Sequence, residues 1–143
     1  LENYSTALEY FEKALKIQQK CLSENHPDLS NTYNNLGSVH SSMNEKQTAL
    51  SHYQRALSIR QGALHPNHPD IALSYNNLGT VYSSMDDKKQ ALACYQRALE
   101  IRNVSLPPTH PAMVSTYNNI GSVHHAMKDY ITALSCFHKA LDV

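Results

Sequence analysis

A 42-residue repeat runs through this sequence and restricts the folds open to it. His-Pro pairs begin at His26, His68 and His110, each 42 residues after the one before. Other landmarks keep the same spacing: Tyr33, Tyr75 and Tyr117; Leu36, Leu78 and Ile120; Gly37, Gly79 and Gly121; Ala49, Ala91 and Ala133. Tandem repeats of this kind fold by stacking one small unit on the next. We therefore predict a single array over residues 1–143 and not two domains.

Each repeat has the pattern of a helical hairpin. In the first repeat, apolar residues at spacings of three and four run through 29–43 and again through 49–59. Pro27 suits a first helical turn, and Asn44 tolerates the left-handed conformation that ends a helix. This pattern predicts helices at about 28–43, 46–62, 70–85, 88–104, 112–127 and 130–142.

The segment before the first His-Pro pair matches the second helix of a hairpin through Ala7, Phe11 and Ala14. The predicted order is therefore an unpaired second helix in 1–25, repeats at 26–67 and 68–109, and a truncated repeat at 110–143, with seven helices in all. A glycine inside a helix costs about 1 kcal/mol. The glycines at 37, 79 and 121 therefore indicate close approach of the two helices of each hairpin.

The residues at fixed positions resemble the tetratricopeptide repeat. They are Tyr33, Leu36, Gly37, His40, Ala49, Tyr53 and Ala56, then Tyr75, Leu78, Gly79, Tyr82, Ala91, Tyr95 and Ala98, then Tyr117, Ile120, Gly121, His124, Ala133, Phe137 and Ala140. The 42-residue period, the His-Pro-Asp lead-in, Asn-Asn-Leu and the endings "RALSIR" and "RALEIR" are similar to the repeats of kinesin light chain. The resemblance implies an all-α fold, a right-handed superhelical solenoid of stacked antiparallel helix pairs. The first helix of each pair, the A helix, would form the concave wall.

Asparagine pairs recur inside the A helices, where asparagine is a mediocre helix former. The resemblance implies that a short linear segment binds in the concave groove and that asparagines of this helix hold its backbone. A carboxamide both donates and accepts hydrogen bonds, as such a role requires. The predicted peptide-binding residues are first Asn35, Asn77 and Asn119, then Asn34, Asn76 and Asn118, together with Ser38, Thr80 and Ser122.

A structural role for the asparagines is the alternative, because they could instead hydrogen bond between adjacent A helices or to the next repeat. The groove positions hold no Lys or Arg, which disfavours a clamp for a C-terminal carboxylate. The recurring basic residues of the second helices, Lys13, Arg55, Arg97 and Lys139, are predicted on an outer or lateral face. Arg60 and Arg102, near the ends of those helices, are within reach of the groove edge.

The nine histidines do not have the spacing of a metal site or a catalytic site. His26, His68 and His110 precede prolines at helix starts, which favours a capping or turn role. His40 and His124 stand where Tyr82 supplies an aromatic ring, and His125 is predicted to face the groove. The sequence also lacks a phosphate loop and a nucleophile elbow. We expect no catalytic residue, no metal ligand and no cofactor.

Charge and composition narrow the partners. Twelve basic and twelve acidic residues leave the chain neutral, which does not favour nucleic acid. No apolar run approaches the roughly 20 residues of a transmembrane helix, so we expect no membrane insertion. Three cysteines, without metal-ligand spacing, indicate free thiols and a cytoplasmic location.

Two functions fit these observations. The first is a protein-protein interaction module, an adaptor that binds a linear peptide or partner segment in the groove. The second is a structural scaffold or self-associating array that regulates another domain of a larger parent protein. The predicted terminal helices favour end-to-end association, because they would leave apolar residues uncovered. Those residues are Ala7, Phe11 and Ala14, and Leu134, Phe137 and Leu141.

Overall fold

The computed structural model describes residues 2–143, so residue 1 of the predicted array lies outside the described residues. Over that range all regular structure is α-helical, in seven helices. They are α1 (Glu2–Cys21), α2 (Pro27–Ser42), α3 (Lys46–Ala63), α4 (Pro69–Ser84), α5 (Lys88–Ser105), α6 (Pro111–Ala126) and α7 (Tyr130–Leu141). The predicted all-α fold and the predicted helix positions are confirmed.

The helix ends follow from the residues that the repeat places there. His26, His68 and His110 each accept a hydrogen bond on Nδ1 from the backbone N–H two residues later, at 3.2, 3.1 and 3.1 Å. Each histidine therefore caps the start of an A helix, and the proline after it is the first residue of that helix. The predicted capping role of these histidines is confirmed.

The turns between paired helices use left-handed backbone. Asn44, Asp86 and Lys128 have φ values of 62°, 63° and 65°. Asn and Asp adopt this conformation more readily than other non-glycine residues, since their short side chains hydrogen bond locally. The prediction for Asn44 is confirmed, and the same turn recurs after α4 and α6.

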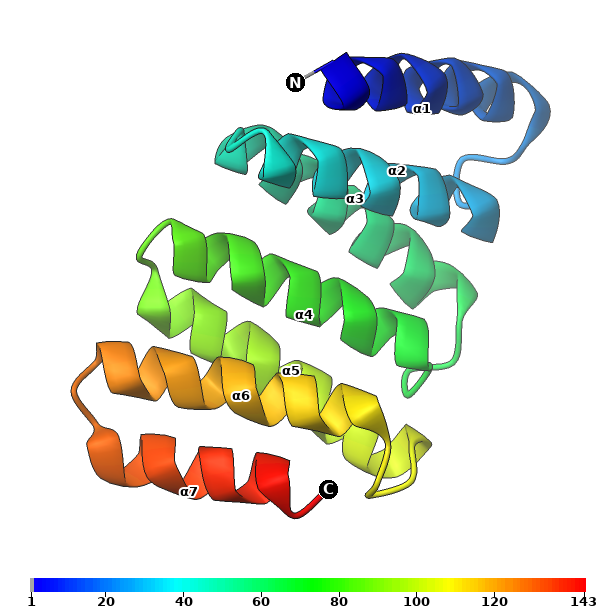
Figure 1. Cartoon of the computed structure of the whole chain (residues 1–143). Helices are drawn as coiled ribbons and strands as arrows, with labels where there is room; N and C mark the ends of the chain where they lie inside the picture. Colours follow the sequence, from blue (N-terminus) through cyan, green and yellow to red (C-terminus); the bar gives the residue numbers. More distant parts are fainter. Residues whose placement is uncertain (1) are drawn as a thin grey trace. The chain divides into compact units, whose positions relative to one another are not determined.

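The chain forms two compact units. Unit 1 is Leu1–His65 and contains α1, α2 and α3; unit 2 is Pro66–Val143 and contains α4, α5, α6 and α7. In unit 1, α2 packs against both α1 and α3. In unit 2, α5 and α6 each contact the helices next to them in sequence, and α6 also contacts α4 (Figure 1). The predicted single array, with its repeat boundaries, stays a prediction.

The mid-helix glycines make room for aromatic rings of the paired helix. A Cβ added at Gly37 would lie 2.8 Å from Cδ1 of Tyr53, and one at Gly79 would lie 2.6 Å from Cε1 of Tyr95. Real Cβ atoms do not approach other heavy atoms this closely. The predicted close approach within each hairpin is confirmed, and its physical reason is the ring that covers the glycine.

The core of unit 2 shows how one repeat packs on the next. Tyr95 and Ala91 of α5 are buried together with Ile120 and Val123 of α6. Leu92 and Leu99, on the same helix as Tyr95, are partly buried against this cluster. The second helix of one repeat is thus covered by the A helix of the following repeat.

Candidate functional site

The asparagine pairs of unit 2 lie on two A helices that contact each other, α4 and α6. The side chain of Asn119 donates a hydrogen bond from Nδ2 to Oδ1 of Asn76, with 3.2 Å between the two atoms. One asparagine of each pair therefore links the two helices, which is the structural role considered above. This bond uses one of the two amide hydrogens of Asn119, so the carboxamide keeps further capacity to donate and accept.

Exposure differs between the members of the pairs. Asn35 of α2 and Asn118 of α6 are exposed, and within residues 2–143 neither side chain has a hydrogen bond. Asn34, Asn76 and Asn119 are half-buried, as is Asn77. The carboxamides most accessible to a ligand are thus the second of the pair in α2 and the first of the pair in α6. The prediction that the second asparagine of each pair binds first stays a prediction.

The hydroxyl positions beside the asparagines are tied to the second helix of the same hairpin. Thr80 donates to the backbone oxygen of Asn76 at 3.1 Å and accepts from the Tyr95 hydroxyl at 3.2 Å. Burial raises the pKa of Tyr95, and the bond to Thr80 opposes that rise.

Ser38 and Ser122 occupy the equivalent positions in the other hairpins. Burial raises the pKa of Tyr53, and a hydrogen bond with Ser38 opposes that rise. Phe137 has no hydroxyl to offer, and Ser122 donates to the backbone oxygen of Asn118 at 2.8 Å. Ser38, Thr80 and Ser122 are all exposed, but in two of three hairpins the hydroxyl also fixes a buried tyrosine.

Two arginines near the ends of second helices are buried. Arg60 is 3% exposed and Arg102 is 6% exposed. Arg60 donates to Ser30 Oγ at 3.2 Å and to Asn31 Oδ1 at 3.0 Å. Both arginines are therefore internal donors and are not displayed at a groove edge, a role that their sequence position did not reveal.

Arg102 reaches from α5 to the start of α6. Its Nη1 donates to the backbone oxygen of Ala112 at 2.9 Å and to Thr116 Oγ1. Burial lowers the pKa of the Arg102 guanidinium from its ordinary value. The recurrence of "RALSIR" and "RALEIR" was the available signal for this contact, because a basic residue kept at one repeat position invites a structural explanation.

The histidines at the aromatic position are held by acidic residues of the following turn. His40 Nδ1 lies 2.6 Å from Glu45 Oε2, and His124 Nδ1 lies 3.1 Å from Asp129 Oδ2. The His40 ring also stacks on His52 of α3, with centroids 5.2 Å apart. Both histidines are half-buried, and the His40 ring packs on another ring as predicted for an aromatic position.

His125 is exposed and packs edge-on against Tyr130, with ring centroids 5.3 Å apart. Over the described residues, no group of His, Cys, Asp and Glu could hold a metal ion. None of the helices in that range is both long and apolar enough to cross a membrane.

The basic residues predicted on a lateral face fall into two kinds. Lys13, Arg55 and Arg97 pair with Glu9, Glu24 and Glu100 at 2.5, 2.8 and 2.7 Å. Lys139 instead lies over the ring of Tyr117, 5.9 Å from its centroid, and has no ion pair within residues 2–143.

Comparison with protein-family models finds two matches, both described as tetratricopeptide repeat. One model matches residues 1–62 and 47–103, and the other matches residues 113–143. Among the curated proteins, no sequence matches this chain.

Several solved structures share the fold. BtubC (BKLC) from P. vanneervenii superposes with a TM-score of 0.91 at 28% identity, over 99% of this chain and 56% of its own. The nearly identical TPR-like repeats assigned to a kinesin light chain of Podosopora anserina give 0.86 at 19% identity, over 97% and 66%. The apo form of RapI gives 0.83 at 23% identity, over 96% and 37%.

This chain therefore spans 56% and 66% of the length of the first two of these structures. The family models together match most of its residues. The chain belongs to the tetratricopeptide repeat family, and its structural neighbours are kinesin light chain-like repeat proteins.

Proposed function

We propose that this chain binds an extended segment of a partner protein on the faces of its A helices that carry the asparagine pairs. Tetratricopeptide repeats are protein-interaction modules and in general are not enzymes. The observation that carries the proposal is that Asn35 and Asn118 are exposed and that neither side chain has a hydrogen bond within residues 2–143. A second observation is the contact of Asn119 with Asn76 in unit 2. It places two asparagine pairs side by side on adjacent helices, and unit 1 offers the same pair on α2.

The chemistry of these side chains suits a peptide backbone. A carboxamide can accept from a ligand N–H and donate to a ligand C=O without reading the ligand side chain. Each such bond contributes about 1 kcal/mol net, so the asparagines alone would give weak binding. Side-chain pockets beside them must supply selectivity and the remaining affinity.

A peptide-display screen against the whole chain tests the proposal. The variant combines Asn35→Ala, Asn77→Ala and Asn119→Ala, and its fold is checked by circular dichroism. Asn25→Ala is the matched control, because Asn25 is an exposed loop asparagine outside the A helices. We expect enriched peptides that bind the control like the wild type and lose at least tenfold in affinity for the triple variant. Equal binding by all three proteins would contradict the proposal.

Self-association is a second candidate, favoured by the outer face of α7. Ile131, Leu134 and Leu141 are 87%, 58% and 81% exposed, whereas the equivalents of the two leucines in α5 are partly buried against α6. An uncovered apolar stripe of this kind can pack against another chain. Light scattering over a concentration series should then show oligomers that Leu134→Glu abolishes. A monomer at all concentrations would exclude this candidate.

A further inference from the structure

Two cavities occupy equivalent places in the repeat, one in each unit. The cavity of unit 1 measures about 380 Å³, and that of unit 2 measures about 310 Å³. Each is lined by a second helix, the loop after it, the next A helix and the hairpin partner of that A helix, and no lining residue belongs to an asparagine pair. Tyr33 and Arg55 line the first, and Tyr117 and Lys139 stand at the same positions of the second, 84 residues later.

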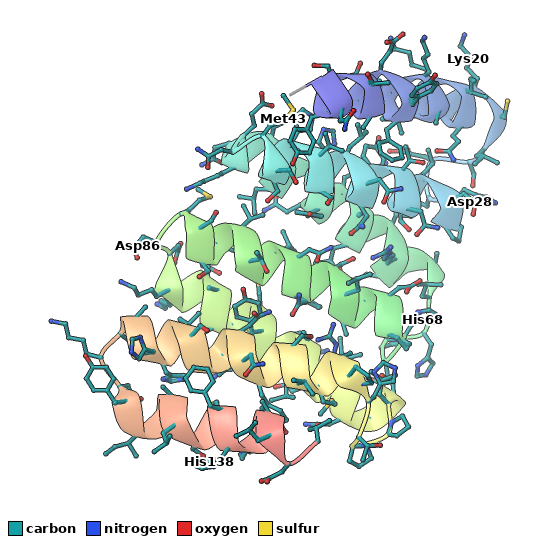
Figure 2. The ribbon with its side chains drawn as sticks, in the orientation of Figure 1. Lys20, Asp28, Met43, His68, Asp86 and His138 are labelled. Carbon is teal, nitrogen blue, oxygen red and sulfur yellow. The ribbon has the colours of Figure 1, made fainter. Side chains whose placement is uncertain are left out.

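The cavity of unit 1 contains its own acidic group. Glu24, in the loop between α1 and α2, places Oε1 2.8 Å from Nη2 of Arg55. Figure 2 labels Lys20 and Asp28, which lie on either side of this loop. The Tyr33 hydroxyl accepts a hydrogen bond from Gln19 Nε2 at 3.2 Å. The cation and the phenol of this cavity are thus both satisfied within unit 1.

The cavity of unit 2 has the same parts but lacks the acidic group of the loop. Pro108 stands at the position of Glu24, and Asn103, shorter by one methylene, stands at the position of Gln19. Lys139, which follows the labelled His138 in Figure 2, has no ion pair in the described part of the chain, and Tyr117 lies beneath it. Leu106 and Met113 form an apolar part of the wall, and the acidic Asp142 and Val143 line it as well.

We infer that the cavity of unit 2 binds a glutamate side chain presented by a partner protein, as Glu24 is presented to Arg55 in unit 1. The Lys139 ammonium would take the carboxylate, and the Tyr117 hydroxyl can donate to it. The apolar wall would cover the methylene stem of the glutamate. Asp142 also lines the cavity, and its negative charge opposes the entry of a second carboxylate, so a single glutamate should bind weakly.

The simplest probe is N-acetyl-glutamate methylamide, with N-acetyl-glutamine methylamide as the neutral match. Met113 is 3% exposed and lines the cavity, whereas Met43, Met85 and Met127 do not. Methyl-labelled methionine therefore reports on the site by NMR, with three internal controls. At constant ionic strength, the glutamate probe should shift the Met113 methyl with a Kd on the order of millimolar. The glutamine probe and sodium acetate should shift it at least fivefold less.

Three substitutions sharpen the test. Lys139→Met keeps the stem and removes the charge, and should abolish the shift. Pro108→Glu supplies the acidic residue that unit 1 already has, and should weaken binding at least tenfold. Asp142→Asn removes the opposing charge and should tighten binding severalfold.

The inference is overturned if the glutamine probe or acetate shifts Met113 as much as the glutamate probe does. Unchanged binding in both Lys139→Met and Pro108→Glu, with the other methionine signals intact, would also overturn it. The asparagine pairs play no part in this experiment, so its failure leaves the proposed function standing, and the reverse also holds.

Discussion

The junction between a second helix and the next A helix is built once in each unit, 84 residues apart, with different side chains. In unit 1, Gln18 of α1 accepts a hydrogen bond from the Thr32 hydroxyl of α2 at 2.7 Å. In unit 2, Arg102 and Thr116 hold the equivalent positions, and the arginine donates to the threonine. The repeat thus keeps a polar contact at this junction, partly buried in unit 1 and buried in unit 2, while it exchanges a neutral group for a charged one.

The cavities beside the two junctions also differ in their charged residues. Unit 1 neutralises the cation of its cavity with Glu24, whereas unit 2 has Pro108 in that place and leaves Lys139 without an ion pair among the described residues. Helix packing and cavity shape are common to both units, since they depend on apolar residues that recur every 42 positions. Binding chemistry is local, because it depends on single positions that the repeat does not preserve.

Helix packing is common to both units, so its disruption should destabilise both units alike. We expect this disruption to have the largest effect on the free energy of unfolding. Gly37→Ala and Gly79→Ala each force a methyl group onto a buried tyrosine ring, Tyr53 or Tyr95. We expect each to lower the free energy of unfolding by about 3 kcal/mol. Urea denaturation gives the change, and hydrogen exchange assigns it to unit 1 or unit 2.

Gly62→Ala is the matched control in α3. Nothing lies within 4 Å of a Cβ added there, so the methyl group should raise the free energy of unfolding by about 0.5–1 kcal/mol. A loss for Gly62→Ala similar to that for Gly37→Ala would mean that helix geometry, and not the covering ring, explains the glycines.

The junction of unit 2 should tolerate glutamine in place of Arg102, because unit 1 already has Gln18 at the equivalent position. Arg102→Gln gives unit 2 the residue of unit 1 and should cost less than about 1 kcal/mol. Arg102→Ala removes the donor and leaves a void, and should cost about 2 kcal/mol. Equal losses for the two variants in thermal or urea denaturation would show that the two junctions are not interchangeable.

The smallest expected difference between the units concerns pH. Burial, and then the neighbouring His40, lowers the pKa of His52, with Glu12 opposing. Below the unfolded value of about 6.5 the unfolded chain therefore takes up a proton that the folded chain resists. The stability of unit 1 should be complete above that pH and fall as the solution is acidified.

His52→Cys tests this dependence, because Cys94 and Cys136 occupy the equivalent positions in unit 2. We expect hydrogen exchange in α2 and α3 to accelerate less between pH 7 and pH 5 in the variant than in the wild type, after correction for the intrinsic rate. Identical slopes would assign the acid response to other groups.

Much of the fold could be predicted from the sequence, because it rests on features that recur. Helix positions followed from the His-Pro caps, the apolar spacing and residues such as Asn44 that accept left-handed backbone. The recurrence of Arg60 and Arg102 indicated a structural role, but not that both side chains are buried. An arginine near the end of a helix is normally expected on the surface. The hydroxyl and carbonyl groups of the adjoining helix, which accept its hydrogen bonds, explain why each arginine is buried.

The candidate site was predictable in position more than in detail. The sequence placed asparagine pairs on the A helices, but the bond from Asn119 to Asn76 depends on how closely α4 and α6 approach. The exposure of Asn35 and Asn118 likewise depends on which face of each helix its neighbours cover. The spacing of residues within one helix does not indicate how closely two helices approach or which of its faces the neighbouring helices cover.

The central claim is that asparagine carboxamides hold the backbone of a bound peptide. It is tested most directly by a double-mutant cycle with a display-selected peptide, its variants N-methylated at one backbone nitrogen at a time, and the protein with and without Asn77→Ala. N-methylation removes the ligand N–H from which a carboxamide oxygen would accept a hydrogen bond. At one peptide position the two changes should be non-additive by about 1 kcal/mol, roughly a fivefold difference in Kd. Additive losses at every position would contradict the claim and leave the asparagines as links between helices.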